Sequence, residues 1–374
     1  MRIYWYWPFA REEDFELALA TPGEGDSLVL HALDRPGVPR DSRGRVTVRA
    51  DLPDVSTDPE RSLRWAVSRT ATYRSRARSR RSAIASGGFD VAHVAFLNQY
   101  TDVVDLRALA RRVPLVTTIH DVLPHRSRMP RRAQHVILGR LYANCGTMVV
   151  HHADVANELV ERFDIDPALV HVVPHWVSPF RAADDRRTLS DRHRILFFGT
   201  LRENKGVRVL LEALERIPPD SGIEVHIAGR GDAALEALVR DAAARISFLS
   251  AEIDWITPTR KAELFRDADA AVLPYTAFSS QSGVLHDAFG NHLPAIVTDV
   301  GALRTSIEEP GAGWVVSPGS VDELADALTE ACSDPDRWQR ASDGARSVAI
   351  AQAPDRIGAA FRSVYASVID ASGH

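Results

Sequence analysis

Cysteine is scarce in this chain of 374 residues, which contains only Cys145 and Cys332. Neither a disulfide framework nor a cysteine-ligated metal site is therefore indicated. The sequence also lacks an apolar run of about eighteen residues, the length that a membrane-spanning helix needs. Its N-terminal stretch becomes acidic before any signal-type apolar core develops, so we expect a protein that stays in the cytoplasm.

Lysine is equally scarce. Lys205 and Lys261 are the only lysines, and every other fixed basic side chain is arginine. Because arginine is the default basic residue of this chain, each lysine draws attention to its own position. The formal net charge of -5 argues against a general nucleic-acid-binding protein, and we expect no nucleic-acid partner.

Short β-rich runs alternate with helical patterns along the whole chain, which indicates an α/β fold with parallel sheets and helices on both faces. A chain of this length favours two domains. We expect Rossmann-like domains over 1–178 and 195–353, a polar linker over 179–194, and a C-terminal helix within 354–374. The predicted strands are 2–7, 27–32, 45–50, 91–96, 114–119, 147–151, 170–173, 195–198, 223–228, 246–249, 270–274, 295–298 and 313–316.

The segment FFGTLRENKG is the first candidate for chemistry. A strand ends at Gly199, a turn carries Arg202 and Lys205, and Gly206 opens the next helix. Parallel sheets bind ligands at the carboxyl ends of their strands, which favours an anion site in this turn. The alternative is a charged surface turn whose basic side chains only face water. The rarity of lysine favours the anion site.

The segment IAGRGD follows another predicted strand. Gly229 and Gly231 would let the backbone approach a ligand closely. The segment falls short of the full dinucleotide fingerprint, so a nicotinamide enzyme is not supported.

The third segment, LPYTAFSSQSGVLHDAFGNHLPAIVTDVG, reads as strand, serine-rich loop, helix, turn and strand. A helix that opens near Ser282 would present its unpaired N–H groups around Gly283 and Val284 to an anion. Asp287 lies on the same helix face, about 6 Å further along the axis, which suits contact with a ribose hydroxyl. In the alternative interpretation, Ser280 or Ser282 only caps the helix and Asp287 faces solvent.

These segments, in this order, resemble family-4 retaining glycosyltransferases. The likeness extends to FDVAHVAF, PLVTTIHDVLP, VHVVPHW, FRDADAAVLPY and GAGWVVSPGSVDELADAL, and covers most of the chain. It implies a GT-B fold, in which two Rossmann-like domains face each other across a cleft and the C-terminal helix returns to the N-terminal domain. It further implies that a nucleotide diphosphate sugar, with UDP or GDP, is bound by the C-terminal domain, that the acceptor is bound by the N-terminal domain, and that the anomeric configuration is retained.

The resemblance also implies roles for individual residues. Lys205 and Arg202 would hold the diphosphate, since Thr200 occupies the family's usual arginine position. Asp287 would contact the ribose, and His120 would lie beside the transferred sugar. The implied donor-binding set is Gly199, Thr200, Gly229, Gly231, Ser282, Gly283, Val284 and Asp287.

The sequence departs from the family pattern at two places. Ser279 stands where the family carries the first glutamate of a spaced pair, which removes an expected contact to the donor sugar. Aromatic residues replace the glycine-rich loop after the first strand, which suggests an unusual acceptor. The predicted acceptor wall is Trp5, Trp7, Phe9, Asn98, Gln99 and Tyr100.

Arginines cluster between Arg61 and Arg81, interleaved with Trp65 and Tyr73. This segment could be a solvated helix, a peripheral contact with anionic lipid at the inner face of the membrane, or a binding site for an acidic acceptor.

The string RDADA has the spacing of a metal-binding DxD motif. Because it runs directly into a strand, we interpret it as the end of a helix and the start of that strand. No metal and no cofactor are expected.

The leading function is therefore metal-independent, retaining transfer of a sugar to a small-molecule, glycolipid or natural-product acceptor. One alternative is a sugar-nucleotide 2-epimerase on the same fold, against which the missing glutamate counts. Another is a non-catalytic GT-B partner protein, against which the presence of His120, Lys205 and Asp287 counts.

Overall fold

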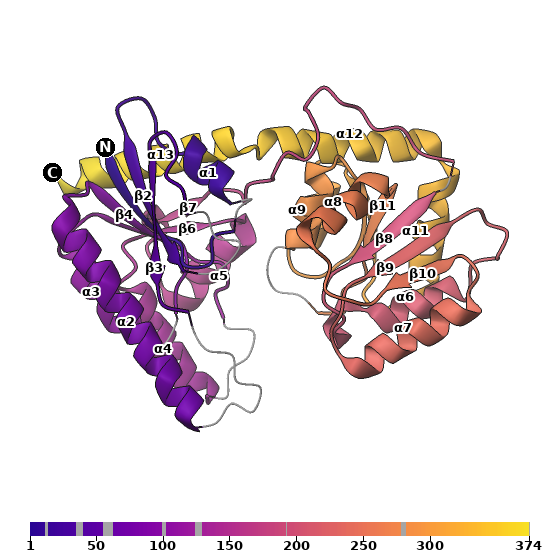
Figure 1. Cartoon of the computed structure of the whole chain (residues 1–374), viewed down its shortest axis with the longest axis horizontal. Helices are drawn as coiled ribbons and strands as arrows, with labels where there is room; N and C mark the ends of the chain where they lie inside the picture. Colours follow the sequence, from indigo (N-terminus) through magenta and orange to yellow (C-terminus); the bar gives the residue numbers. More distant parts are fainter. Residues whose placement is uncertain are drawn as a thin grey trace. The chain divides into compact units, whose positions relative to one another are not determined.

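The computed structural model describes residues 1–11, 14–34, 40–54, 63–98, 102–123, 129–191, 193–277 and 282–373, except for the side chains of residues 63, 64 and 66 (Figure 1). Two compact units make up the chain. Met1–Trp176 and Pro354–His374 form the N-terminal unit, and Val177–Ala353 forms the C-terminal unit.

The N-terminal unit is built on a parallel sheet of seven strands in the order β3-β2-β1-β4-β5-β6-β7. The chain adds strands outward from β1 in one direction, then returns to β4 on the other side of β1. The point between β1 and β4, where the direction reverses, is where such sheets bind ligands. The strands are β1 (Arg2–Tyr6), β2 (Ser27–Leu33), β3 (Val46–Leu52), β4 (Val91–Val94), β5 (Leu115–Thr118), β6 (Thr147–Val150) and β7 (Val170–Val172).

Helices cover both faces of this sheet, which explains why β1 is buried from Ile3 to Tyr6. Alternation along the strand sends Tyr4 and Tyr6 into the core beneath helices α2 to α5. Ile3 and Trp5 enter the opposite core with residues of α13. The helices are α1 (Phe15–Ala20), α2 (Leu63–Gly87), α3 (Asp102–Ala110), α4 (Arg131–Tyr142), α5 (Ala153–Phe163), the 3₁₀ turn Pro167–Leu169 and α13 (Pro354–Ser372).

The final helix, α13, packs on the N-terminal unit, against elements that lie far from it in sequence. The hydroxyl of Tyr365 lies 2.7 Å from Nδ1 of His93 on β4. The guanidinium of Arg362 donates to the carbonyl oxygens of Ala20 and Thr21 at the end of α1. Within the described part of the chain, no helix has the length and apolarity needed to cross a membrane.

The C-terminal unit has a second parallel sheet, of six strands in the order β10-β9-β8-β11-β12-β13. Its direction reverses between β8 and β11. The strands are β8 (Arg194–Phe198), β9 (Glu224–Ala228), β10 (Leu249–Glu252), β11 (Ala270–Leu273), β12 (Ala295–Thr298) and β13 (Gly313–Val316). The helical elements are the 3₁₀ turn η2 (Glu203–Lys205), α6 (Val207–Leu214), α7 (Ala233–Arg245), α8 (Pro258–Asp267), α9 (Gly283–Gly290), α10 (Leu303–Glu308), α11 (Val321–Ser333) and α12 (Pro335–Ala351).

The α/β class and both parallel sheets confirm the sequence prediction, but the predicted strand 246–249 is wrong. Ile246 instead terminates α7, where its N–H donates to the carbonyl of Ala242, and β10 begins at Leu249. Its apolar side chain is buried at the end of the helix rather than in the sheet.

The segment 179–194, expected to be a linker, is attached to the C-terminal unit. The buried guanidinium of Arg187 donates to the carbonyl oxygens of Phe265, Arg266, Ala268 and Asn291. A side chain that satisfies so many backbone acceptors fixes its own segment in place.

Candidate functional site

The loops that follow β8, β9 and β11 come together at the carboxyl edge of the C-terminal sheet. A β-carbon at Gly229 would overlap the carbonyl of Gly199, and one at Gly231 would overlap the carbonyl of Leu201. The glycines of IAGRGD therefore allow two loops to pack backbone against backbone. This differs from the expected role of bringing the backbone close to a ligand.

Gly206 fixes the next part of the site. Its φ of +68° lies in the left-handed region, and a β-carbon there would overlap the carbonyl of Pro274 after β11. The N–H of Thr276 donates to the carbonyl of Asn204 at 3.1 Å, which joins the same two loops. The turn that carries Lys205 is thus held against the loop after β11, at the reversal point of the sheet.

Lys205 lies half-buried in this turn, with Nζ 3.6 Å from the centre of the Tyr275 ring. Burial and the neighbouring charge of Arg202 lower the pKa of Lys205 to about 8. Arg202 and Thr200 are exposed beside it. Tyr275, which the sequence analysis did not single out, therefore supports the ammonium group with its ring face.

The helix α9 begins beside the same tyrosine. The hydroxyls of Ser282 and Tyr275 are 3.1 Å apart, and Ser282 is buried at the N-cap without a side-chain capping bond. Gly283 is exposed, and a β-carbon there would meet no atom within 4 Å. The start of α9 is therefore open at Gly283, and Val284 is half-buried in the same turn, whereas the N–H of Leu285 already donates to the carbonyl of Ser282 at 2.9 Å. Ser279 and Ser280 lie outside the described residues.

Asp287, one turn into α9, does not simply face solvent. Its carboxylate makes a 2.8 Å ion pair with Nζ of Lys261 on α8, and both side chains are largely buried. Lys261 is the second of the two lysines and has no role in the sequence analysis. Its rarity in an arginine-rich chain was the signal that could have identified it.

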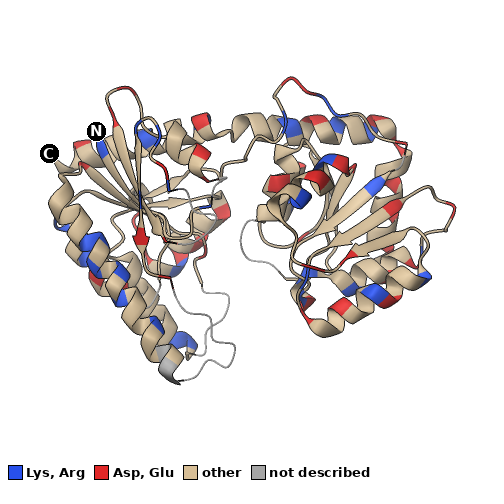
Figure 2. Ribbon diagram, viewed as in Figure 1, with Lys and Arg blue, Asp and Glu red and all other residues tan. Residues whose placement is uncertain are grey.

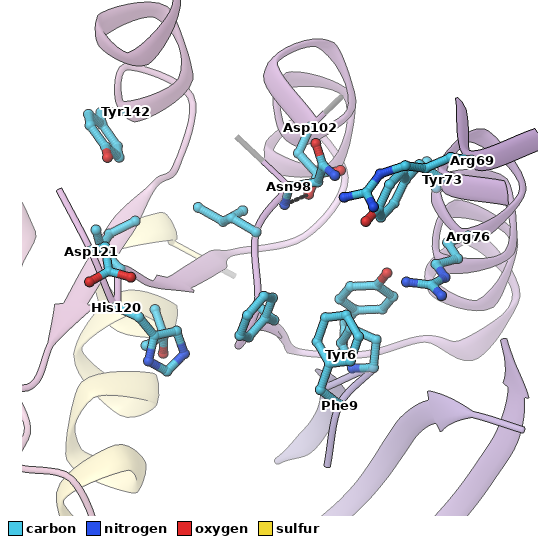
Figure 3. Close-up of a pocket in the computed structure, with 16 residues that line it drawn as sticks. Tyr6, Phe9, Arg69, Tyr73, Arg76, Asn98, Asp102, His120, Asp121 and Tyr142 are labelled. Atoms are coloured by element: carbon cyan, nitrogen blue, oxygen red, sulfur yellow. Dashed lines mark hydrogen bonds between the residues drawn. The ribbon is translucent and has the colours of Figure 1, made fainter. Parts of the chain in front are cut away.

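A pocket of about 680 Å³ opens at the corresponding reversal point of the N-terminal sheet (Figure 3). Phe9 follows β1, and Asn98 follows β4. His120 and Asp121 follow β5, and Tyr73 comes from α2. The residues that line the pocket are Tyr6, Pro8, Phe9, Arg69, Tyr73, Arg76, Ala77, Phe96, Leu97, Asn98, Asp102, Thr118, Ile119, His120, Asp121 and Tyr142.

His120 is a neutral group at one side of this pocket. Its Nε2 donates to the carbonyl of Ala95 at 2.9 Å, and burial lowers the pKa of His120 below its ordinary value. Nδ1 therefore carries no proton at neutral pH and can accept a hydrogen bond.

The predicted acceptor wall divides in two. Phe9 and Asn98 line the pocket, whereas Gln99 and Tyr100 lie outside the described residues. Trp5 and Trp7 were wrong candidates, because each is less than 10% exposed and belongs to the core beneath α13. The alternation of side chains along β1 sends these tryptophans to the sheet face opposite Tyr6.

Asp269 of the DxD-like string has a structural role, because it ties the segment before β8 to the start of β11. It is 3% exposed and accepts hydrogen bonds from the N–H and hydroxyl of Ser190 and from the N–H of Arg194. Asp267 lies at the end of α8. Among the described residues, no group of three or more His, Cys, Asp or Glu side chains is arranged to hold a metal ion.

Comparison with known proteins agrees with this geometry. A model described as Glycosyltransferase Family 4 matches residues 15–181, and one described as Glycosyl transferases group 1 matches residues 192–334. The chain belongs to glycosyltransferase family 4. Both units and the loops described above lie largely within the matched residues.

Two relatives show sequence similarity to this chain over part of their length. It is 26% identical to a D-inositol 3-phosphate glycosyltransferase of Nocardia farcinica over 64% of this chain and 57% of the relative. It is 31% identical to a phosphatidyl-myo-inositol mannosyltransferase of Mycolicibacterium smegmatis over 44% of this chain and 40% of the relative. The chain thus matches about half the length of these relatives.

The GT-B fold is supported by solved structures. Anabaena HepE in complex with UDP aligns with a TM-score of 0.68 at 14% identity, over 98% of this chain and all of that one. The expectation of an α/β GT-B glycosyltransferase fold is confirmed.

Proposed function

We propose that this family-4 member is a metal-independent, retaining glycosyltransferase that uses a nucleotide diphosphate sugar. The proposal rests on one arrangement in the C-terminal unit. Lys205 and the open N-terminus of α9 adjoin the same residue, Tyr275, at the reversal point of the sheet. A cation and a helix N-terminus at one place form a site for a diphosphate. The solved HepE structure, which holds UDP, is consistent with such a donor.

Most of the predicted donor residues take a role in this proposal, whereas Gly229 and Gly231 serve the packing of the loops. Lys205 and Arg202 neutralise the diphosphate, and the N–H groups of Gly283 and Val284 donate to its oxygens. Thr200 and Gly199 border the same turn. Asp287 accepts a hydrogen bond from a ribose hydroxyl, and Lys261 holds that carboxylate in position.

Chemistry in this proposal consists of one exchange of bonds at the anomeric carbon. The bond from that carbon to the phosphate oxygen breaks, and a bond to the acceptor oxygen forms on the same face. The acceptor proton passes to the departing phosphate oxygen. Lys205 stabilises the charge that develops on the diphosphate, which lowers the barrier without a metal ion. His120 receives a hydroxyl of the transferred sugar at its unprotonated Nδ1.

The acceptor belongs to the N-terminal unit in this proposal. The pocket there has the volume of small-molecule sites, and aromatic side chains and His120 line it. The relatives whose names give an acceptor act on D-inositol 3-phosphate or phosphatidyl-myo-inositol. A small molecule or a lipid head group that offers a hydroxyl would fit a pocket of this volume.

Thermal shift against UDP, GDP, ADP and TDP, with and without magnesium, tests the donor site. We expect one nucleotide to raise the melting temperature without magnesium, and Lys205→Ala to remove that shift. Arg245→Ala, which deletes an exposed cation on α7, serves as the matched control. Absence of a shift with every nucleotide would favour the non-catalytic partner.

Release of the nucleotide from the matching donor sugar then tests the reaction. Transfer or slow hydrolysis of the donor is expected, and NMR of the product reports its anomeric configuration. Epimerisation of the donor sugar at C2 would replace this proposal with the epimerase, and an inverted product would contradict retention.

A further inference from the structure

The arginine-rich helix α2 has two different sets of basic side chains. Figure 2 shows basic residues along the length of this helix. Arg69 and Arg76 line the pocket of the N-terminal unit and lie on the same face of α2, with Tyr73 between them. Arg74 and Arg78 are exposed and do not line it. Some arginines of the cluster therefore line the pocket, whereas Arg74 and Arg78 face solvent.

Arg76 is a built part of the pocket wall, because it is only 2% exposed. Its Nε donates to the carbonyl of Pro53 at 2.8 Å, and its Nη2 lies 3.3 Å from a carboxylate oxygen of Asp54. The guanidinium also lies over the rings of Phe9 and Tyr73. These contacts hold a positive charge at a fixed position, as a preformed site for an anion requires.

Arg69 is held between the rings of Trp65 and Tyr73, with its guanidinium carbon 5.1 and 5.2 Å from their centroids. It makes no ion pair with any residue that the structure describes. The two rings direct the side chain without neutralising it, because a cation–π contact leaves the charge in place. Arg69 is thus a positioned cation at the mouth of the pocket.

The nearby carboxylate of Asp102 does not cancel these charges. Arg80, 1% exposed, donates to Asp102 at 2.9 Å and also to Asp105. Asp102 in turn accepts the N–H of Asn98, which fixes the loop at the pocket rim. Asp105 is paired with Arg81 as well, at 3.2 Å, so Arg80 and Arg81 together balance Asp102 and Asp105 inside the fold. Asp54 pairs with Arg76, and the excess positive charge on the α2 side of the pocket is therefore that of Arg69.

The opposite side of the pocket differs in character. Figure 3 shows His120 and Asp121 across from Arg69, Tyr73 and Arg76, with Tyr6 and Phe9 between them. A ligand that spans the pocket would meet two guanidinium groups at one end and a neutral imidazole with a carboxylate at the other. The first end suits an anion, and the second suits hydroxyl groups.

We infer that the acceptor of this enzyme carries an anionic group, a phosphoryl or carboxylate, which Arg69 and Arg76 bind while a hydroxyl of the same molecule lies at the opposite end of the pocket, near His120 and Asp121. That the ligand is an acceptor rests on the proposed function. That the pocket binds an anion rests only on the residues that line it. A soluble phosphorylated polyol and an anionic lipid head group share this chemistry. The pocket, rather than the exposed arginines, selects either one.

The first test measures the binding of matched probes to the full chain by thermal shift or calorimetry. Inorganic phosphate and glucose 6-phosphate are compared with glucose, and phosphatidylglycerol vesicles with phosphatidylcholine vesicles. All are measured in the Lys205→Ala background, so that anions at the proposed diphosphate site do not contribute. We expect the anionic probes alone to bind, with the soluble or the vesicle arm identifying the source.

Arg69→Gln supplies the decisive variant, because Arg69 is exposed and its loss should not unfold the protein. We expect it to weaken binding of the anionic probe by about tenfold, the value of one charge-assisted hydrogen bond. Arg74→Gln, on the same helix and also exposed, should bind as the parent does.

Two results would overturn the inference: no binding of any anionic probe, or equal weakening by Arg69→Gln and Arg74→Gln. Equal weakening would indicate general attraction to the helix. The nucleotide shift of the parent chain is scored separately, so an anion site without a nucleotide site would refute the proposed function and leave the pocket assignment standing.

Discussion

Nucleoside diphosphate binding should weaken about tenfold between pH 7 and pH 9, because Lys205 loses its proton in that range. Burial and Arg202 lower the pKa of Lys205 to about 8 in the ligand-free protein. Its ammonium form then falls from about nine-tenths at pH 7 to about one-tenth at pH 9. If that form binds the diphosphate, the change corresponds to about 1.4 kcal/mol.

Affinity falls as the pH rises because the ammonium form of Lys205 is the form that binds the anion. A bound diphosphate stabilises the ammonium form and raises the pKa of Lys205 towards its ordinary value near 10.4, so binding takes up a proton. Uptake should be about half a proton per nucleotide at pH 8 and close to zero at pH 6.5. The terminal phosphate loses its second proton near pH 6, and therefore adds little to the change above pH 7.

Isothermal titration calorimetry at pH 7, 8 and 9, in buffers with different ionisation enthalpies, measures both the affinity and the proton uptake. Lys205→Met should bind more weakly at pH 7 and lose the dependence on pH. An affinity that stays constant from pH 7 to 9, or an unchanged slope in Lys205→Met, would refute the role assigned to this lysine.

Three further predictions concern stability, each followed by urea denaturation. Gly206→Ala should destabilise the chain by more than the ~1 kcal/mol of a strained φ, because the new methyl meets a backbone carbonyl; Gly319→Ala, with positive φ but open space, should show the strain alone. Arg80→Met should cost about 3 kcal/mol, because buried Asp102 loses its ion-pair partner and Asp105 keeps only Arg81, whereas exposed Arg78→Met should change stability by about 0.5 kcal/mol or less. Burial lowers the pKa of His93 to about 3, so between pH 6.5 and pH 3 the unfolded chain binds a proton at this side chain that the folded chain does not. The contribution of His93 to stability should therefore fall by about 1.4 kcal/mol for each pH unit below 6.5, and His93→Gln should remove that part of the slope.

The strand pattern was readable in the sequence because buried parallel strands are short, apolar runs between turns. Twelve of the thirteen predicted strands overlap an observed strand by at least three residues, so the error at Ile246 is informative. An apolar residue that closes a helix looks the same in sequence as one that opens a strand. Only the packing of α7 on the sheet distinguishes them.

The glycines illustrate a second limit. The sequence indicated that Gly229 and Gly231 lie where another group comes close to the backbone, and the structure agrees. It did not indicate what occupies that space. A neighbouring loop and a ligand impose the same requirement on a glycine, and only the positions of Gly199 and Leu201 identify the loop.

By itself the sequence determined the α/β class, the order of the elements and the segments that end at the carboxyl edges of the two sheets, because these depend on local pattern along the chain. Only the tertiary structure decided which side chains meet there. It placed Lys261 on Asp287, buried Trp5 beneath α13, and divided the arginines of α2 between the pocket and solvent. Such pairings join residues distant in sequence, and no local spacing encodes them.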